Sequence, residues 1–456
     1  MNADIKPHAS MNDSGVPWVG AVPSHWTPTK LRTLLERVAE RNRPDLPLLS
    51  VVREKGVVVR DLSNSDDNHN FIPDDLTNYK HVRRGQFAMN KMKAWQGSYG
   101  VSDHEGIVSP AYFVFDLKGV DGRFFHAAIR SRAYVPFFTQ ASDGVRIGQW
   151  DLSDSRMREI PFFVPPPAEQ AAIVRFMDHT DWRIRRYIRA KQKLIKLLEE
   201  QKHAIIHRAV TRGLNPDVRL KPSGVEWLGD VPEHWEARRL RSLARVKTGE
   251  RDTKDRVDGG AFPFFVRSQT VERIDTWSFD GEAVLTAGDG NGGVGKVFHY
   301  VNGKFDYHQR VYKFSHFKEV TGRFFFEYLR ATLKFEALAG NSRSTVNLSL
   351  RQPMLLNFPC VLPPISEQAA IVEYIGRATF SLDATITRAK REIELLNEYR
   401  TRLIADLVTG KLDVREAAAR LPEEVSDADM ADEPAADAEA DESEELVEAV
   451  GEETGA

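Results

Sequence analysis

The stretch PPAEQAAIVRFMDHTDWRIRRYIRAKQKLIKLLEEQKHAIIHRAVTRGL, residues 166–214, occurs twice in this chain. The second copy, PISEQAAIVEYIGRATFSLDATITRAKREIELLNEYRTRLIADLVTGKL, occupies residues 364–412, so every residue is matched by one 198 positions further on. The run EQAAIV begins at Glu169 in the first copy and at Glu367 in the second. An ungapped repeat of this length indicates that the chain contains one structural unit twice.

Both copies have the pattern of one long helix. Proline precedes the first turn at Pro167 and Pro364, and Glu lies within that turn, where the helix dipole favours an anion. Apolar residues recur in alternating steps of three and four, which predicts the heptad seam of a coiled coil. The expected seam consists of Ile173, Met177, Ile184, Leu194, Leu198 and Ile205, and of Ile371, Ile375, Leu382, Leu396 and Leu403. A surface helix of a larger domain is the alternative, but a seam this narrow needs a partner helix, and the chain supplies one.

A shorter repeat precedes each long helix. The segment GVPWVGAVPSHW, residues 15–26, returns as GVEWLGDVPEHW, residues 224–235. We call these the tryptophan segments. Their shared residues include the pairs Trp18/Trp227, Pro23/Pro232, His25/His234 and Trp26/Trp235. Tryptophans repeated in this way are more often packing anchors than ligand-binding residues, so we expect them in the core.

Two unlike stretches lie between the tryptophan segments and the helices, at residues 27–164 and 236–362. Short alternating apolar runs broken by Gly, Asn and Asp predict strands and hairpins, with a helix at residues 323–339. Residues 85–90 of the first stretch correspond to residues 281–286 of the second, and a glycine-bearing loop follows each. A common scaffold with diverged loops is typical of two domains that recognise different ligands.

Composition sets limits on compartment and partners. The chain has no apolar run of membrane length, its N-terminus is polar, and Cys360 is its only cysteine, so we expect a cytoplasmic protein without disulfides or a cysteine-built metal site. Fifteen of its 66 acidic residues and no Lys or Arg lie in residues 423–456, which predicts a disordered acidic tail. The rest carries 63 basic against 51 acidic residues, an excess that favours a polyanionic partner.

The run GNGGVGK, residues 290–296, has the Gly and Lys spacing of a phosphate-binding loop. Val297 follows, however, where such a site needs a Ser or Thr hydroxyl to hold magnesium, and the sequence beyond it alternates like a strand. A helix start that would direct amides at phosphate is not indicated. We therefore interpret the run as a hairpin loop, and we find no motif for a cofactor, a metal or catalysis.

These features together resemble the specificity subunit of type I restriction–modification systems. The resemblance rests on GVxWxGxVPxHW at both repeat starts, on PPPAEQ and PPISEQ at the helix starts, on GEAVLTAGDGNGGVGK, and on NSRSTVNLS at residues 341–349. It covers residues 15–412 in the order found in the family. The acidic tail is not part of the family pattern, and the loop KMKAWQG at residues 91–97 departs from the loop sequence that is usual in the family.

The resemblance implies an α+β chain with tandem pseudo-two-fold symmetry. Two mixed α/β target-recognition domains are separated by two long helices that form an antiparallel coiled coil. The expected organisation is a flexible N-terminus at 1–14, a first recognition domain at 15–165, a first helix at 166–214, a second recognition domain at 215–363, a second helix at 364–412, and a disordered tail at 413–456.

The resemblance also implies a non-catalytic role and a set of partners. These are double-stranded DNA with a bipartite site, two adenine methyltransferase subunits that hold S-adenosylmethionine, and restriction subunits that act as translocase and nuclease. The chain itself is expected to bind no cofactor and no membrane. Each recognition domain would read one half of the target.

Chain geometry independently favours the antiparallel arrangement. A rod of about 40 residues is roughly 60 Å long. The second variable stretch must connect the end of the first helix to the start of the second, and a compact domain of this size has a radius of gyration of about 14 Å. Antiparallel helices place those two chain ends side by side, whereas parallel helices would require the domain to span the rod.

Base contacts are expected from loop residues with suitable donors, because Arg or Lys suits guanine and Asn or Gln suits adenine. The candidates are Lys91, Lys93, Gln96 and Arg146 in the first domain, and Arg267, Asn291, Lys296, Arg310, Arg343 and Asn347 in the second. A solvated or phosphate-facing role is the alternative for each of them. For the whole chain, the alternatives are a coiled-coil scaffold that binds no DNA and a nucleotide-driven enzyme that would rest on residues 290–296 alone.

Overall fold

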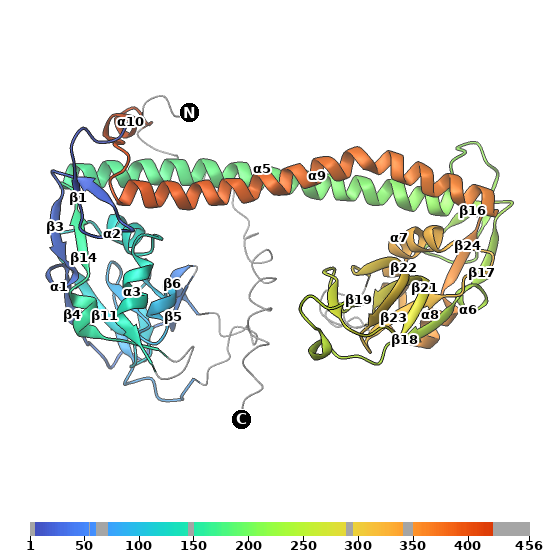
Figure 1. Cartoon of the computed structure of the whole chain (residues 1–456), viewed down its shortest axis with the longest axis horizontal. Helices are drawn as coiled ribbons and strands as arrows, with labels where there is room; N and C mark the ends of the chain where they lie inside the picture. The colour runs from blue at the N-terminus through green and yellow to red at the C-terminus, as the bar shows by residue number, and fades with distance from the viewer. Residues whose placement is uncertain are drawn as a thin grey trace. The chain divides into compact units, whose positions relative to one another are not determined.

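The computed structural model describes residues 5–53, 55–60, 72–144, 150–288, 295–340 and 350–422. It divides into two compact units, one formed by Met1–Arg189 with Ile393–Ala456 and the other by Ala190–Glu392. We call these unit 1 and unit 2 (Figure 1). Each unit contains part of both long helices, so neither unit contains a complete long helix.

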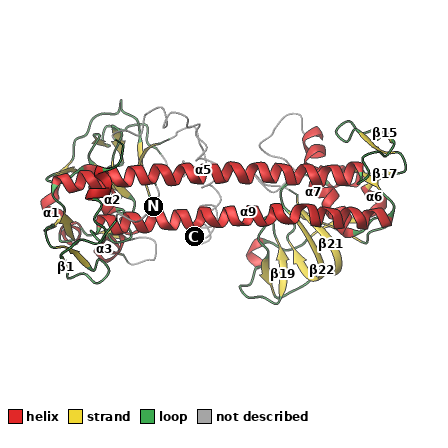
Figure 2. Ribbon diagram, turned by 90° about the horizontal axis from the view of Figure 1, so that it is seen from above, coloured by secondary structure: helices red, strands yellow, loops and turns green. Residues whose placement is uncertain are grey.

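The two long helices are α5, Pro167–Arg212, and α9, Ile365–Val408. They lie side by side in Figures 1 and 2, and ion pairs give their direction. In unit 1, Asp181 of α5 pairs with Arg400 of α9. In unit 2, Lys191 pairs with Glu392 at 2.6 Å, and Lys202, further along α5, pairs with the earlier residue Asp383. The helices are therefore antiparallel within each unit, as the chain geometry predicts.

Burial along the helices follows the expected seam mainly near their ends. Ile173, Ile184, Ile371, Ile375 and Leu403 are all buried. Met177, Leu198, Ile205, Leu382 and Leu396 are partly buried. Leu194 does not fit the seam, because 38% of it is exposed. Polar residues and ion pairs replace apolar contact around it, so the heptad pattern overestimates the apolar character of this part of α5.

The domain of unit 1 is built on a four-stranded sheet in the order β4-β11-β8-β9. These strands are β4, Leu35–Val38, β8, Phe87–Met89, β9, Tyr99–Val101, and β11, Phe113–Leu117. The helices α2, Gly122–Ile129, and α3, Val135–Ala141, supply Phe124, Phe125 and Phe138 to one aromatic core with Phe87 and Phe115. A smaller core lies under the hairpin of β5, Leu49–Val52, and β6, Gly56–Val59. Strands β7, Lys80–Val82, and β10, Gly106–Val108, form a further antiparallel pair.

The domain of unit 2 contains a six-stranded sheet in the order β18-β23-β21-β22-β19-β20. The strands are β18, Arg245–Thr248, β19, Phe262–Phe265, β20, Glu272–Ile274, β21, Phe279–Ala287, β22, Phe298–Tyr307, and β23, Val311–Ser315. Phe305 and Tyr307 of β22 pack with Ala283 and Leu285 of β21 in a small hydrophobic core on this sheet. The helix α7, Gly322–Gly340, confirms the helix expected at residues 323–339.

The two domains share one framework. In each, a strand that follows the tryptophan segment pairs with the strand before the long helix: β3, Thr27–Lys30, with β14, Pro161–Val164, and β17, Glu236–Arg239, with β24, Pro359–Leu362. A one-turn helix comes next, α1, Leu31–Leu34, or α6, Leu240–Leu243. Strands β8 and β21 occupy equivalent central positions, beside β11 and β23 respectively. The expected correspondence of residues 85–90 with 281–286 is therefore confirmed.

The described residues near both chain ends form more structure than the sequence indicates. Residues 1–14 were expected to be flexible, but β1, Met11–Asp13, pairs with β2, Ala21–Pro23, and His8 is buried. The tail was expected to be disordered from residue 413, yet Val414 and Ala418 are buried around the short helix α10, Arg415–Ala419. Val414 belongs to the unit 1 core and Ile5 packs against it, which explains both corrections. Residues 423–456 lie outside the described part of the chain.

The glycine-rich run at residues 290–296 was expected to be a hairpin loop. Residues 295–296 form a turn that leads into strand β22 rather than into a helix, as the hairpin interpretation of the glycine-rich run requires, while residues 290–294 lie outside the described residues. Among the described residues, no helix is long and apolar enough to cross a membrane.

Close packing at the end of α9 gives a test of the unit 1 core. Gly410 has φ +72°, and a Cβ there would lie 2.2 Å from Cδ of Pro23. Gly20 has nearly the same φ, +73°, with nothing within 4 Å of a Cβ. We expect Gly20→Ala to cost about 1–2 kcal/mol for the left-handed backbone alone. Gly410→Ala should cost a further 1–3 kcal/mol, roughly, for overpacking. Calorimetric unfolding of both variants measures the difference, and equal losses would contradict the packing described here.

Candidate nucleic-acid interface and helix junctions

The loop between β8 and β9 carries three of the predicted DNA-binding residues: Lys91, Lys93 and Gln96. Its backbone is held by Asn90, whose Oδ1 accepts the Met92 amide at 3.1 Å and whose carbonyl accepts the Lys93 amide at 3.1 Å. Gly97 ends the short 3-10 turn η1, Ala94–Gln96, with φ +95°. The buried side chain of Ala94 fixes the turn to the core. The loop is therefore a preformed element that presents several donors together.

The three side chains of this loop differ in their surroundings. Lys91 forms an ion pair with Asp151, at 2.8 Å between Nζ and Oδ2, and its carbonyl accepts the Leu152 amide. Lys93 is exposed and Gln96 is half-buried. Arg146, the fourth candidate of this domain, lies outside the described residues. Lys93 and Gln96 are thus better placed than Lys91 to meet a ligand.

In the second domain, Arg267 and Arg310 lie on neighbouring loops and are both exposed. The His308 amide donates to the Phe265 carbonyl at the end of β19, and the Arg310 amide donates to Nδ1 of His308. The Arg310 carbonyl in turn accepts the Gly288 amide at 2.8 Å, and the Gly288 carbonyl accepts the Leu350 amide. Gly288 and Leu350 are the described neighbours of the stretches that contain Asn291, Arg343 and Asn347, which themselves lie outside the described residues.

Lys296 is placed differently from Arg267 and Arg310. It lines a pocket of about 500 Å³ in unit 2, together with α5, α7 and α9 residues. The pocket wall includes Lys202 and Asp383, which form an ion pair, and Glu199 and Lys390, whose charged atoms are 3.4 Å apart. Lys296 therefore adjoins the long helices, and among the candidates that the structure describes it has the weakest geometric case for base readout.

The hydrogen bonds that attach each domain to its helix were not expected from the sequence. The Glu-Gln pair at the start of each long helix makes these bonds to the preceding tryptophan segment and to the domain, and we call each such contact a junction. At the first junction, Glu169 accepts the indole N–H of Trp26 at 2.9 Å and lies 2.7 Å from Nε2 of His25. At the second junction, Glu367 accepts the indole N–H of Trp235 at 3.2 Å and lies 2.9 Å from Nε2 of His234.

The neighbouring glutamine completes each junction. Gln170 accepts the Asp121 amide at 2.7 Å and donates to the Pro165 carbonyl at 2.8 Å. Gln368 accepts the Thr321 amide at 2.8 Å and donates to the carbonyls of Glu319 and Pro363, each at 3.0 Å. Hydrogen bonds to charged groups contribute about 1.5–3 kcal/mol each, and buried polar groups are costly to leave unpaired. These bonds explain why HW and EQ occur together in both halves.

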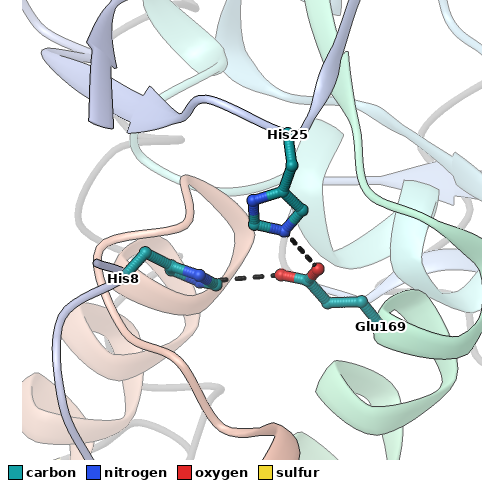
Figure 3. Close-up of side chains that lie close together, drawn as sticks. All are labelled: His8, His25 and Glu169. Carbon is teal, nitrogen blue, oxygen red and sulfur yellow. Dashed lines mark hydrogen bonds and ion pairs between the residues drawn. The ribbon is translucent and has the colours of Figure 1, made fainter. Parts of the chain in front are cut away.

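The first junction has one addition that the second lacks. His8 lies beside Glu169, with 3.6 Å between His8 Nε2 and Oε1 (Figure 3). It also lies beside Asp413, with 3.8 Å between His8 Nδ1 and Oδ2. Burial lowers the pKa of His8 below its ordinary value, although both carboxylates oppose that shift. Hydrogen bonds from Arg415 lower the pKa of Asp413 to about 2. An ionised carboxylate thus faces a largely neutral imidazole at neutral pH.

Part of the second half of the chain matches a known domain family. Residues 232–396 match the family model described as the type I restriction modification DNA specificity domain. This part of the chain is a type I restriction–modification specificity domain. The resemblance inferred from the sequence is thereby confirmed.

Two proteins that are similar to this chain are named as specificity subunits. The type I restriction enzyme EcoDI specificity subunit of Escherichia coli is 28% identical over 184 residues, which make up 40% of this chain and 40% of that protein. The MjaVIII specificity subunit of Methanocaldococcus jannaschii is 24% identical over 302 residues, 61% of this chain and 68% of that protein. The match therefore spans less than half of the E. coli relative.

A solved structure shows the same fold. A chain from a structure on complex assembly and conformational transition of the type I R-M system superposes with a TM-score of 0.57 at 16% identity, and the match covers 85% of this chain and 98% of that chain. The specificity domain thus belongs to a mixed α/β chain with two long helices, as expected.

The buried glutamine of the second junction provides a direct test of its role. Gln368 is fully buried, and Gln368→Leu removes partners from one amide and two carbonyls. We expect the free energy of unfolding to fall by about 2–5 kcal/mol. Each unpaired buried group costs about 1–3 kcal/mol, and some of these groups can form hydrogen bonds to water instead. Gln192→Leu, on an exposed position of α5, is the matched control and should change little. Thermal unfolding measures both, and similar losses in the two variants would refute this role.

Proposed function

We propose that this chain is the DNA specificity subunit of a type I restriction–modification complex. Each of its two domains reads one half of a bipartite double-stranded target. The long helices space the domains and dock two methyltransferase subunits, to which restriction subunits are added. The chain itself is non-catalytic, so methyl transfer and cleavage occur in its partners.

The single observation that carries the proposal is the repeated junction. Both halves keep the same contact between HW and EQ, so both hold a domain on a long helix in the same way. The loops differ, with Lys93 and Gln96 in one domain and Arg267 and Arg310 in the other. Two domains that recognise different base sequences require an attachment that is the same in both and donors that differ between them.

The specificity domain matched at residues 232–396 also favours DNA recognition over a scaffold that binds no DNA. A scaffold would need the paired helices but would have no use for two domains of one framework with different exposed donors. The nucleotide-driven alternative loses support because strand β22, and not a helix, follows Lys296.

Independent readout by the two domains can be tested in the first-domain loop. We expect Lys93→Ala combined with Gln96→Ala to weaken or relax recognition of one half-site only, because each good base contact contributes about 1–3 kcal/mol of discrimination. Lys118→Ala is the control, because this exposed lysine of the same domain pairs with Glu36. The readout is a methylation map of cells that carry the partner methyltransferase, with cells lacking it as the blank. Unchanged recognition at both half-sites, or modification in the blank, would contradict the proposal.

The spacing role of the helices predicts a change in the target. Four helix-forming residues inserted after Leu198 add roughly 6 Å and a net rotation of about 40°. One base pair of B-DNA corresponds to about 34° and 3.4 Å. The variant should recognise the same half-sites with a spacer longer by about one or two base pairs, at reduced stability because the paired helix must adapt.

The matched control for the spacing experiment places the same four residues after Asn215, in the loop beyond α5. This variant should keep the original spacer, because it does not lengthen a helix. Methylation maps of both variants give the answer. An active helix variant that modifies only the original spacing would show that the helices do not measure the target.

A further inference from the structure

The first junction brings together three side chains of metal-binding type from three separate places in the sequence. His8 comes from the N-terminal segment, His25 from the tryptophan segment, and Glu169 from the first turn of α5. One ligand atom from each of them lies within 4.8 Å of the other two. Figure 3 shows both imidazole rings directed at the carboxylate.

His8 is the unusual member of this cluster. Only 7% of the residue is exposed, and neither of its ring nitrogens has a hydrogen-bond partner in the described part of the chain. Leaving a buried polar group unpaired costs about 1–3 kcal/mol. The Glu169 carboxylate is 3.6 Å from Nε2, which is too far for a hydrogen bond but close to the separation of two ligands on one metal ion.

The dimensions suit a tetrahedral divalent transition metal. Ligand atoms about 2.0–2.1 Å from Zn²⁺ stand roughly 3.4 Å from each other. The His8–Glu169 distance of 3.6 Å already fits, whereas the 2.7 Å hydrogen bond between His25 and Glu169 would widen as coordination replaces it. Oε1 of Glu169, the oxygen nearest to His8, would bind the ion while its second lone pair keeps the indole N–H of Trp26.

A carboxylate stands in the right place to orient the metal-binding histidine. With Nε2 of His8 directed at Glu169, its Nδ1 faces Asp413 at 3.8 Å. Histidines that bind metal usually donate their second ring N–H to such a carboxylate, which fixes the tautomer and strengthens the ligand. Asp413 is itself held by Arg415 at 2.6 Å.

We propose that His8, His25 and Glu169 form a binding site for one Zn²⁺ or similar divalent transition-metal ion. A water molecule completes the coordination, and Asp413 orients His8. The ion fastens the N-terminal segment and the segment that follows α9 to the first turn of α5. Its role is structural, and it belongs to the first junction alone.

The second junction provides an internal comparison. It has the equivalent pair His234 and Glu367, with the imidazole 2.9 Å from the carboxylate. The alignment that matches Trp26 with Trp235 places the exposed Asp217 where His8 stands. Among the described residues this junction has no third ligand in its centre, so it should not hold the ion.

The test titrates Zn²⁺ into the tag-free, full-length chain after chelator treatment, by calorimetry. We expect one equivalent to bind, and His8→Ala to weaken binding by at least about 100-fold, because losing an orienting residue alone costs about 10–100-fold. Asp413→Asn should weaken binding about 10-fold. His234→Ala, at the second junction, and His203→Ala, on a half-buried α5 histidine beside His207, should leave the strong site unchanged.

Co²⁺ gives a second readout that does not depend on stability. Bound by two histidines and one carboxylate, it should develop the intense visible absorption of a tetrahedral ion, and this should vanish in His25→Ala as well as in His8→Ala.

Saturating Zn²⁺ should raise the unfolding temperature of the unaltered chain but not that of His8→Ala. Binding that survives both substitutions, loss with His203→Ala instead, or no saturable binding to the unaltered chain would each overturn the proposal.

Discussion

The architecture depends on a carboxylate at the first turn of each long helix. Glu169 is buried and Glu367 is partly buried, and each accepts an indole N–H and contacts a histidine. A carboxylate removed from water is tolerated only when it is hydrogen-bonded, so each glutamate commits its helix to one position against the tryptophan segment. The adjacent glutamine extends this constraint to backbone groups of the domain.

Each junction also joins the end of the other long helix. In unit 1, Leu407 and Val408 of α9 share a core with Trp26 and Ile173. In unit 2, Ala209 and Val210 of α5 share a core with Trp235 and Ile371. Each unit therefore needs residues from both halves of the repeat, and neither half of the chain completes a core alone. Antiparallel pairing of the helices follows, because only that direction brings the end of one helix to the start of the other.

The division between constant and variable parts has a functional meaning. Equivalent junctions attach domains whose sheets share central strands but whose loops offer different donors, such as Lys93 in one and Arg267 in the other. Loop residues can diverge because they contribute little to the buried core, whereas a changed Trp, Glu or Gln would leave buried polar groups unpaired. The function proposed above needs this combination of a fixed attachment and an adaptable surface.

The sequence alone determined the duplication, both long helices and the burial of Trp26 and Trp235, whereas it placed Trp18 in the core although 38% of that residue is exposed. These features repeat or follow a local period, so they can be inferred from neighbouring residues. The repeat also held a signal for the junctions, because HW and EQ recur together, but the partner of each glutamate was not evident from helix-start chemistry.

Only the tertiary structure decided the register of the helices, the exposure of Leu194 and the meeting of His8 with Glu169 and Asp413. His8 and Asp413 are more than 400 positions apart in the numbering, and His8 occurs in only one half, so no period or repeat could connect them. Their proximity arises because the two chain ends pack on the same core, and such long-range contacts depend on the whole unit having folded.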